Sequence, residues 1–347
     1  MSHVENLTPF AALAIPSMLV SGADALIVLI AGRFLLPPPG KSTLDPPTVA
    51  EEQPDPPLAD THRGPPETSS LLTAGQATCG RPGTDVWIEG HAVAPGEKPA
   101  ERVDVALVIP DRLQKTVAVF GDRVWTQGIG TLTPQSPRPF VRMPLVYERA
   151  FGGAEPGDAP VRPFEPRNPV GRGFFEKESQ ALGQPLPNLE DPRDLLRTPR
   201  DRPRPMAFGP IARSWQPRLG YAGTYDQKWL DDIAPAWPKD LDPRFFHNVP
   251  PDQVVTPHLR GGEAIGISGV HPAGQIHFAL PSHRLSVKTV LHAQVTWQSP
   301  ELDAVIIEPD AGAFTVIWRA VTPLPKGPLD HEYSVVRTLF DWEAPPR

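Results

Sequence analysis

The distribution of apolar residues along the chain predicts β-strands more often than helices. The longest apolar run covers residues 25–36 and is rich in Leu, Ile and Val, as expected for a buried strand. From residue 85 onward, segments such as RVDVALVIP and KTVAVFGDRVW partly alternate apolar and polar residues, with turn residues about every 8–12 positions. This spacing is typical of antiparallel hairpins. With a further strand at 143–147, it predicts a strand-rich part over residues 10–150.

The same pattern returns in the last third of the chain. Segments including EAIGISGV, LSVKTVLHAQVTW and FTVIWRAV predict a second set of antiparallel strands over residues 254–325, followed by a tail at 326–347. We expect a single large domain, residues 1–347, that is mainly β and sandwich-like with few short helices. The two strand-rich parts either share one core or form two sheets, and the sequence leaves both open.

Two segments interrupt the strands and lack regular periodicity. Residues 37–67 form an acidic, proline-rich loop by composition. Residues 154–250 alternate single aromatic residues with Pro, Arg and Asp, and predict a long loop insertion. One short helix is expected at 224–232, where Tyr225 and Trp229 have helical spacing. The aromatic density of the insertion favours order, because disordered segments are poor in aromatic residues.

Composition and charge limit the partners and the compartment. The chain has 48 Pro and 28 Gly, which agrees with long loops on a folded core. A net charge of −7 argues against nucleic acid as the partner, because phosphate binding needs a basic surface. The single cysteine, Cys79, excludes an intrachain disulfide and fits a reducing compartment.

The chain also lacks the signals of export and membrane insertion. Its N-terminus has no basic region followed by an apolar run, as a signal peptide would. The most apolar stretch is interrupted by Asp24 and Arg33 and is shorter than the roughly 20 residues that cross a bilayer. We therefore expect a cytoplasmic protein with no membrane partner.

No residue pattern assembles a catalytic, cofactor or metal site. His271, His277 and His283 recur at even spacing, but proline and glycine interrupt any single strand that would carry them. No cysteine pair or His-Glu-x-x-His motif accompanies them. We expect no catalytic residues, no cofactor and no bound metal.

Carboxylates are nevertheless plentiful, and they support one enzyme alternative. A glycosidase-like hydrolase works with two carboxylates at a fixed separation beside aromatic residues. Most of the acids lie next to Arg, Lys or a turn residue, as in Asp122–Arg123 and Glu148–Arg149, so ion pairing or turn capping explains them more simply. The carboxylates that we consider are Asp122, Glu148, Glu190, Asp226, Asp240 and Asp242.

A recurring combination of arginine, aromatic residues and proline is the more informative signal. Arg, Trp, Tyr and Phe are prominent in protein–protein interfaces, and proline limits the entropy lost when a loop is fixed. The combination fits a pre-organised recognition surface and a small core built from loops equally well. The residues that we single out as partner-binding or architectural are Glu148, Arg149, Phe151, Asn168, Arg172, Phe174, Trp215, Arg218, Tyr225, Asp226, Trp229, Asp242, Arg244 and Phe245.

The segment MPLVYERAFGG, residues 143–153, shows how the combination is used. Its glycine pair permits positive φ and a close approach of backbones. Arg149 is able to bind a carboxylate or to stack on an aromatic ring such as Phe151 or Trp215. We expect this corner to connect the insertion to the sheet, so that its role is mainly architectural.

Several motifs occur in a fixed order: RPGTDVWIEGHAVAPGE (81–97), VFGDRVW (119–125), MPLVYERAFGG (143–153), NPVGRGF (168–174), LPNLEDP (186–192), FGPIARSWQPR (208–218), AGTYDQKW (222–229), PKDLDPRFFHNVPPDQ (238–253) and IIEPDAGAFTVIWRA (306–320). Together they resemble a bacterial family called domain of unknown function 2169, over roughly residues 10–325. Members usually carry a lysine in the first strand, where this chain has Gly32 and Arg33.

The resemblance implies a function because members of that family are encoded in type VI secretion loci. It implies an adaptor or chaperone that helps a toxic effector, often one with a PAAR spike tip, to load onto the VgrG spike. It supplies no catalytic residues. We expect a non-enzymatic adaptor whose partners are the effector, PAAR or VgrG proteins. The hydrolase and a structural component of the spike are the alternatives.

Overall fold

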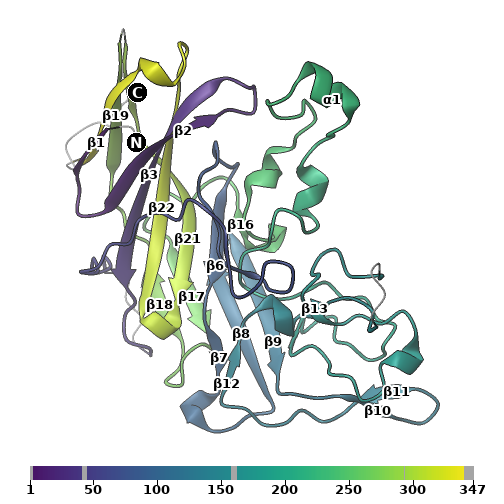
Figure 1. Ribbon diagram of the computed structural model, residues 1–347. Helices are drawn as coiled ribbons and strands as arrows, with labels where there is room; N and C mark the ends of the chain where they lie inside the picture. The colour runs from purple at the N-terminus through teal and green to yellow at the C-terminus, as the bar shows by residue number, and fades with distance from the viewer. Residues whose placement is uncertain (1–2, 41–44, 158–161, 293, 340–347) are drawn as a thin grey trace.

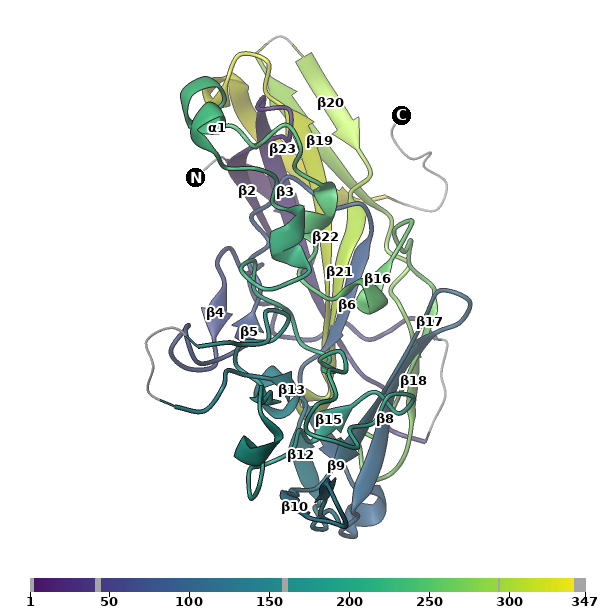
Figure 2. The same cartoon turned by 90° about the vertical axis from the view of Figure 1, so that its right-hand side faces the viewer.

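The computed structural model describes residues 3–40, 45–157, 162–292 and 294–339, and the chain is mainly β, as the sequence predicts (Figure 1). Three sheets of four or more strands form the framework. Figure 1 shows the insertion lying to one side of it, and Figure 2 shows the strands of the four-stranded sheet at one end of the molecule and β10 (Trp125–Gln127) at the other. No helix within the described residues is long and apolar enough to cross a membrane.

A six-stranded sheet forms the centre of the framework. Its order is β16 (Val254–Val255), β6 (Thr84–Ile88), β21 (Glu301–Glu308), β22 (Ala313–Pro323), β3 (Asp24–Leu35) and β2 (Ala11–Met18). β22 pairs antiparallel with β3, and β6 pairs in parallel with β21. The buried strand predicted at 25–36 is confirmed by β3. Because β3 and β22 come from opposite ends of the sequence, the two strand-rich parts share a sheet.

A five-stranded sheet also combines both parts of the sequence. Its order is β15 (Leu189–Glu190), β9 (Leu113–Phe120), β8 (Arg102–Ile109), β17 (Ala264–Ser268) and β18 (Ile276–Ala279). β8 and β9 form the antiparallel hairpin that their alternation predicts. Val105 and Ile265 of this sheet belong to the same buried cluster as Val86 and Phe314 of the six-stranded sheet. The two sheets therefore share one apolar core.

A four-stranded sheet corrects the expectation of a C-terminal tail. Its order is β1 (Val4–Leu7), β23 (His331–Thr338), β19 (Leu285–Leu291) and β20 (Gln294–Gln298). β23 is an inner strand, so the tail predicted at 326–347 is wrong for its described residues. Of the inward side chains of β23, Ser334 is buried but polar and small, which hides the alternation. Residues 340–347 lie outside the described residues.

The insertion at 154–250 is irregular, as predicted. Its α-helix is α1 (Gln227–Asp232), which lies inside the helix expected at 224–232. Asp226 caps this helix by accepting a hydrogen bond from the Trp229 N–H at 2.8 Å. We call residues 218–246 the α1 lobe, which Figure 1 shows set apart from the sheets. Other short elements are β14 (Arg172–Gly173), η3 (Glu178–Gln180), η4 (Arg218–Tyr221) and η5 (Pro243–Phe246).

The strand expected at 143–147 is shorter than predicted. β12 (Arg142–Pro144) pairs with β7 (His91–Val93), and Pro144, which has no N–H, ends the ladder. The chain then turns through η2 (Tyr147–Arg149) into β13 (Phe151–Gly152). The loop expected at 37–67 contains one two-residue strand, and its residues 41–44 lie outside the described residues. The remaining elements are β4 (Thr61–His62), β5 (Leu71–Thr73), η1 (Pro95–Glu97), β11 (Leu132–Pro134), η6 (Pro251–Gln253), η7 (Pro309–Ala311) and η8 (Pro328–Asp330).

Candidate functional site

The residues singled out in the sequence lie in three places rather than in one site. The corner after β12 contains the largest group, a second group lies at a cavity between the α1 lobe and the sheets, and α1 carries the third. The corner group is Glu148, Arg149, Phe151, Asn168, Arg172 and Phe174, with Trp215 packed beside it. The cavity group is Arg218 and Arg244, which line the cavity, with their partners Phe245 and Asp242. The helix group is Tyr225, Asp226 and Trp229.

The adjacent charges of the corner have different partners. Glu148 accepts hydrogen bonds from the N–H of Ser70, at 2.7 Å, and from its hydroxyl. Arg149 donates to Asn188 Oδ1 at 3.0 Å and lies 3.4 Å from Asp122 Oδ1. The ion pair expected between Glu148 and Arg149 is therefore wrong. The side chains instead connect the corner to segments far away in the sequence.

The second expected pair, Asp122 with Arg123, is also replaced. Arg123 pairs with Glu190, and both side chains are buried. Burial is the largest influence on the Glu190 carboxyl and raises its pKa, although Arg123 opposes the shift. Arg123 lies between β9 and β10 and Glu190 lies in β15, so this ion pair joins segments that are 67 residues apart in the sequence.

Asn168 holds the backbone of the corner together. Its side-chain Nδ2 donates to the carbonyl oxygens of Tyr147, at 2.8 Å, and of Phe151, at 2.9 Å. Gly153 has a φ of +86°, and a Cβ at this position would overlap the carbonyl oxygen of Gly171. The glycine pair is thus required for the close approach of two backbone segments.

The remaining corner residues also make internal contacts. Arg172 donates from Nε to the carbonyl oxygen of Glu148 at 2.9 Å, and burial, followed by the nearby Arg149 charge, lowers its pKa. The guanidinium of Arg202 lies 4.9 Å from the ring centre of Phe174. The ring of Trp215 packs edge-on against Tyr147 at 5.5 Å. Arg149 has amide and carboxylate partners in place of the stacking on Phe151 or Trp215 that the sequence suggested.

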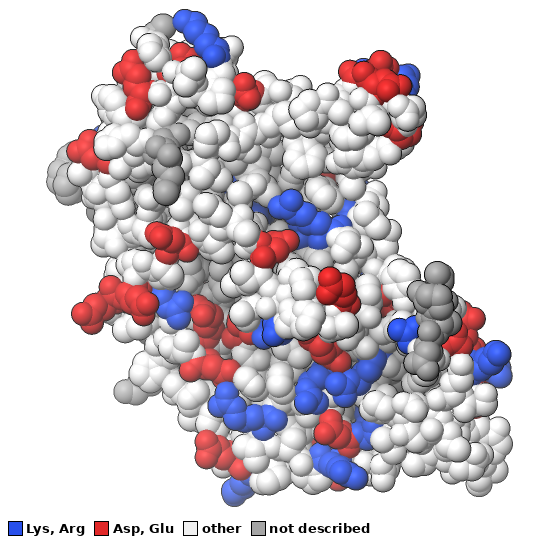
Figure 3. Space-filling model, viewed as in Figure 1, with Lys and Arg blue, Asp and Glu red and all other residues white. Residues whose placement is uncertain are grey.

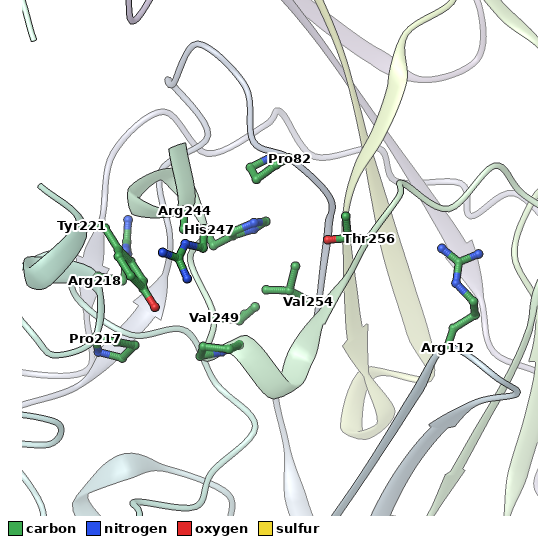
Figure 4. A pocket seen from close by; sticks show the side chains of 11 residues that line it. Pro82, Arg112, Pro217, Arg218, Tyr221, Arg244, His247, Val249, Val254 and Thr256 are labelled. Atoms are coloured by element: carbon green, nitrogen blue, oxygen red, sulfur yellow. The ribbon is translucent and has the colours of Figure 1, made fainter. Parts of the chain in front are cut away.

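A cavity of about 520 Å³ lies where η4 and η5 face β16 and the loop before β6 (Figure 4). Figure 4 shows Arg218, Tyr221 and Arg244 on one side of it and Arg112 on the opposite side. The lining contains cationic, aromatic and apolar side chains and no carboxylate. The lining residues are Pro82, Arg112, Pro217, Arg218, Tyr221, Arg244, His247, Val249, Pro251, Val254 and Thr256.

Arg218 is the most deeply buried cation of this wall, with 2% of its surface exposed. Its guanidinium donates to the carbonyl oxygens of Ile211, at 2.5 Å, and Phe245, at 3.3 Å. Nη2 has no hydrogen-bond partner. Burial, and secondarily the charge of Arg213, lowers the pKa of Arg218 to about 10. The positive charge thus remains at neutral pH without a carboxylate bound to it.

Arg244 and His247 complete the polar part of the wall. Arg244 pairs with Asp242 at 2.6 Å and lies 4.3 Å from the ring centre of Tyr221. The Nδ1 of His247 lies 2.6 Å from Asp85 Oδ1, and both residues are buried. Sequence reasoning missed Tyr221, His247 and Asp85, although all three lie within or beside the motifs quoted above.

Asp85 belongs to a buried ionic network that the sequence also did not reveal. Arg81 lies 2.9 Å from Asp85 and 3.4 Å from Asp303, and Arg319 lies 2.7 Å from Asp303. Burial favours a higher pKa for Asp303, but the charges of Arg319 and Arg81 outweigh it and hold the pKa below its ordinary value. The network fixes the base of the wall on which His247 lies.

The helix group forms the outer end of the α1 lobe. The rings of Tyr225 and Trp229 meet edge to face at 4.7 Å, and Trp229 Nε1 donates to the carbonyl oxygen of Ala236 at 2.9 Å. Tyr225 and two leucines of the lobe remain about half exposed: Leu219 at 51%, Tyr225 at 49% and Leu230 at 57%. Three large apolar side chains in one small lobe make it a candidate contact surface.

Among the described residues, no three His, Cys, Asp or Glu side chains are grouped so that they could hold a metal ion. His271 accepts from the Ala273 N–H, whereas His277 bonds to Gln275. His283 packs against Phe10 at 5.1 Å, and burial lowers its pKa. The three histidines thus lie in separate surroundings. On the face shown in Figure 3, acidic and basic side chains are interspersed.

Comparison with known proteins places this geometry in a family. The model of domain of unknown function 2169 (DUF2169), described as an uncharacterized protein conserved in bacteria, matches residues 21–319. The chain belongs to this family. The corner, the three arginines that line the cavity and α1 all lie inside the range that the DUF2169 model matches. No curated protein and no solved structure matches the chain.

Proposed function

We propose that this DUF2169 protein is a non-enzymatic adaptor that binds a type VI secretion effector, typically one linked to a PAAR tip, and assists its loading onto the VgrG spike. The family resemblance supplies the secretion setting. The α1 lobe supplies the observation that carries the proposal, because it exposes Leu219, Tyr225 and Leu230 on an otherwise ordered projection. Partly exposed Leu and Tyr side chains of this kind would supply the apolar anchors of an interface with another protein.

The lobe is suited to binding because its backbone is fixed before a partner arrives. Ala222, Leu241, Phe245 and Phe246 form a small buried cluster inside it. Asp240 accepts hydrogen bonds from the N–H and the hydroxyl of Thr224, at 3.0 and 2.7 Å. A fixed loop surface loses less conformational entropy on binding than a flexible one. This supports recognition of a folded partner.

The test uses the effector encoded beside the gene for this chain. Co-expression should raise the soluble yield of the effector and give one co-eluting complex. A triple variant, Leu219→Ser with Tyr225→Ser and Leu230→Ser, should weaken the complex at least about tenfold, because interface anchors carry most of the binding energy. Calorimetry on the purified proteins measures the change.

Ile129→Ser is the matched control, since Ile129 is fully exposed in the turn between β10 and β11, at the other end of the molecule. It should bind the effector like the unchanged chain. Separate elution of the two proteins, with unaltered effector yield, would contradict an adaptor. Recovery of the chain in secreted fractions would favour a spike component, and turnover of a carbohydrate by the purified chain would favour the hydrolase.

A further inference from the structure

The cavity beside the α1 lobe is lined by three arginines and, among the described residues that line it, by no carboxylate. Of its cationic lining residues, Arg244 is paired with Asp242. The hydrogen bonds of Arg218 go to carbonyl oxygens, and Arg112 donates to the carbonyl oxygen of Pro257 at 2.6 Å. These two arginines therefore lack a bound carboxylate, in a chain whose net charge is −7.

Burying a guanidinium that has no bound carboxylate lowers the stability of the fold. Arg218 has given up its water shell, yet Nη2 donates to nothing. Buried charges are normally paired, because desolvation without a counter-charge costs free energy. The acids nearest in the wall are already engaged: Asp85 binds Arg81 and His247, and Asp242 binds Arg244. A carboxylate in the cavity would bring a counter-charge close to this wall of arginines.

We infer that this cavity binds a carboxylate of a polypeptide partner. The inference rests on the proposed function and specifies where on the chain the partner binds. A planar guanidinium matches a carboxylate and forms strong, charge-assisted hydrogen bonds with it. The volume of about 520 Å³ lies within the range of ordinary ligand pockets, which is room for an acidic residue and its neighbours.

The remainder of the lining favours a peptide over a free inorganic anion. Val249, Val254 and the prolines at 82, 217 and 251 give apolar contacts for aliphatic side chains next to the acid. The ring of Tyr221 is held in place by Arg244. A site built for an inorganic anion would need only the cationic wall.

The carboxylate comes from an acidic side chain or from a chain terminus, and calorimetry with three peptides separates these sources. The first is a pentapeptide blocked at both ends with one central Glu, the second is its Gln counterpart, and the third is the Gln peptide with a free C-terminal carboxylate. We expect the first or the third to bind at least about tenfold more tightly than the Gln peptide, as a charge-assisted hydrogen bond requires.

Two variants locate the site, and a third serves as control. Arg218→Met should weaken binding of the carboxylate peptide about ten- to hundredfold. Because Arg218 is buried and its replacement can unfold the lobe, Arg244→Met provides a second reading at an exposed position and should weaken binding at least about threefold. Arg138→Met removes the same charge from an exposed residue outside the lining and should leave binding unchanged.

Equal affinity for the Glu, Gln and free-carboxylate peptides, absence of binding by all three, or equally tight binding of inorganic sulfate would overturn the inference. So would an equal loss of affinity in Arg138→Met and Arg244→Met. The two proposals fail separately: an effector that co-elutes undiminished with Arg218→Met and Arg244→Met contradicts the carboxylate site alone. Binding of the Glu peptide without any effector complex contradicts the adaptor alone.

Discussion

The central six-stranded sheet and the insertion at 154–250 are ordered by different interactions. In the sheet, β3 and β22 bury nearly all of their side chains and pair residue by residue along their length. In the insertion, Phe208 and Trp215 join the main core, but the other apolar clusters are small, and individual polar side chains position the backbone, as Asn168 does at the corner. A sheet distributes its stability over many equivalent contacts, whereas each polar anchor of a loop has a unique role.

This difference explains why the insertion carries the candidate binding features. A sheet face buried on a core has no side chains left for a partner, but a loop held from its own backbone can expose Leu219 and Tyr225 and still keep its shape. The insertion is therefore sensitive to single substitutions, because losing one polar anchor leaves buried groups without hydrogen-bond partners. Substitutions in the two regions should therefore differ in size and in how far their effects spread.

The largest effect is expected at the glycine pair. Gly153→Ala should destabilise the chain by about 3–4 kcal/mol, from the positive φ and the overlap with the Gly171 carbonyl together. Urea unfolding measures the loss.

Gly183→Ala is the matched control, because Gly183 also has a positive φ, +76°, with open space around its Cβ position. It should lose only about 1–2 kcal/mol. Equal losses of stability in the two variants would mean that the corner adjusts to the added Cβ. The close approach of Gly153 to Gly171 would then not anchor the insertion firmly.

A pair of substitutions then separates local from global loss. Asn168→Ala removes the side-chain donor to the carbonyls of Tyr147, which keeps the Ala150 N–H as a donor, and of Phe151, and it should cost about 2 kcal/mol. Ile307→Ala, in the buried strand β21, should cost about 3 kcal/mol. Hydrogen exchange should accelerate mainly within the insertion for Asn168→Ala, but throughout the sheets for Ile307→Ala.

Exchange that rises uniformly in both variants would erase the distinction between the two regions. It would show that the insertion and the sheets unfold as one unit, with the corner as part of the common core.

The same contrast decides how much could be predicted from the sequence. β3 and the hairpin β8–β9 follow from apolar periodicity, because their side chains alternate between a buried and an outer face. β23 was missed because Ser334 fills an inward position, and the early strands β1 and β2 were missed because their residues are mostly half-buried. Burial that comes from neighbouring strands cannot be inferred from the local pattern of apolar and polar residues.

The candidate residues were chosen from the sequence by residue type, and the sequence did not indicate where in the fold they would lie. Arg218 and Arg244 were chosen as members of an Arg–aromatic pattern, and both line the cavity. His247 lines the same cavity as both arginines, and it contacts Asp85, which is 162 residues away in the sequence. Such juxtapositions depend on tertiary packing, so the sequence alone gave candidates spread over three places.

The smallest effect concerns an anchor of the insertion that titrates. Burial favours a higher pKa for Asp201, but hydrogen bonds from the N–H groups of Arg197 and Thr198 and from the Thr198 hydroxyl outweigh it, so its pKa lies below the ordinary value. A carboxyl with a lowered folded-state pKa stabilises the fold above its unfolded pKa of about 3.9 and loses this contribution as pH falls through the folded pKa. The unchanged chain should therefore lose more stability between about pH 5 and pH 3 than Asp201→Asn does.

Asp201 is partly exposed, so the difference should stay below about 1 kcal/mol. Urea unfolding at each pH measures it, with Asp55→Asn, at an exposed position of the loop 37–67, as the control for the same change in charge. Parallel pH profiles for Asp201→Asn and the unchanged chain would show that this carboxylate does not anchor the insertion.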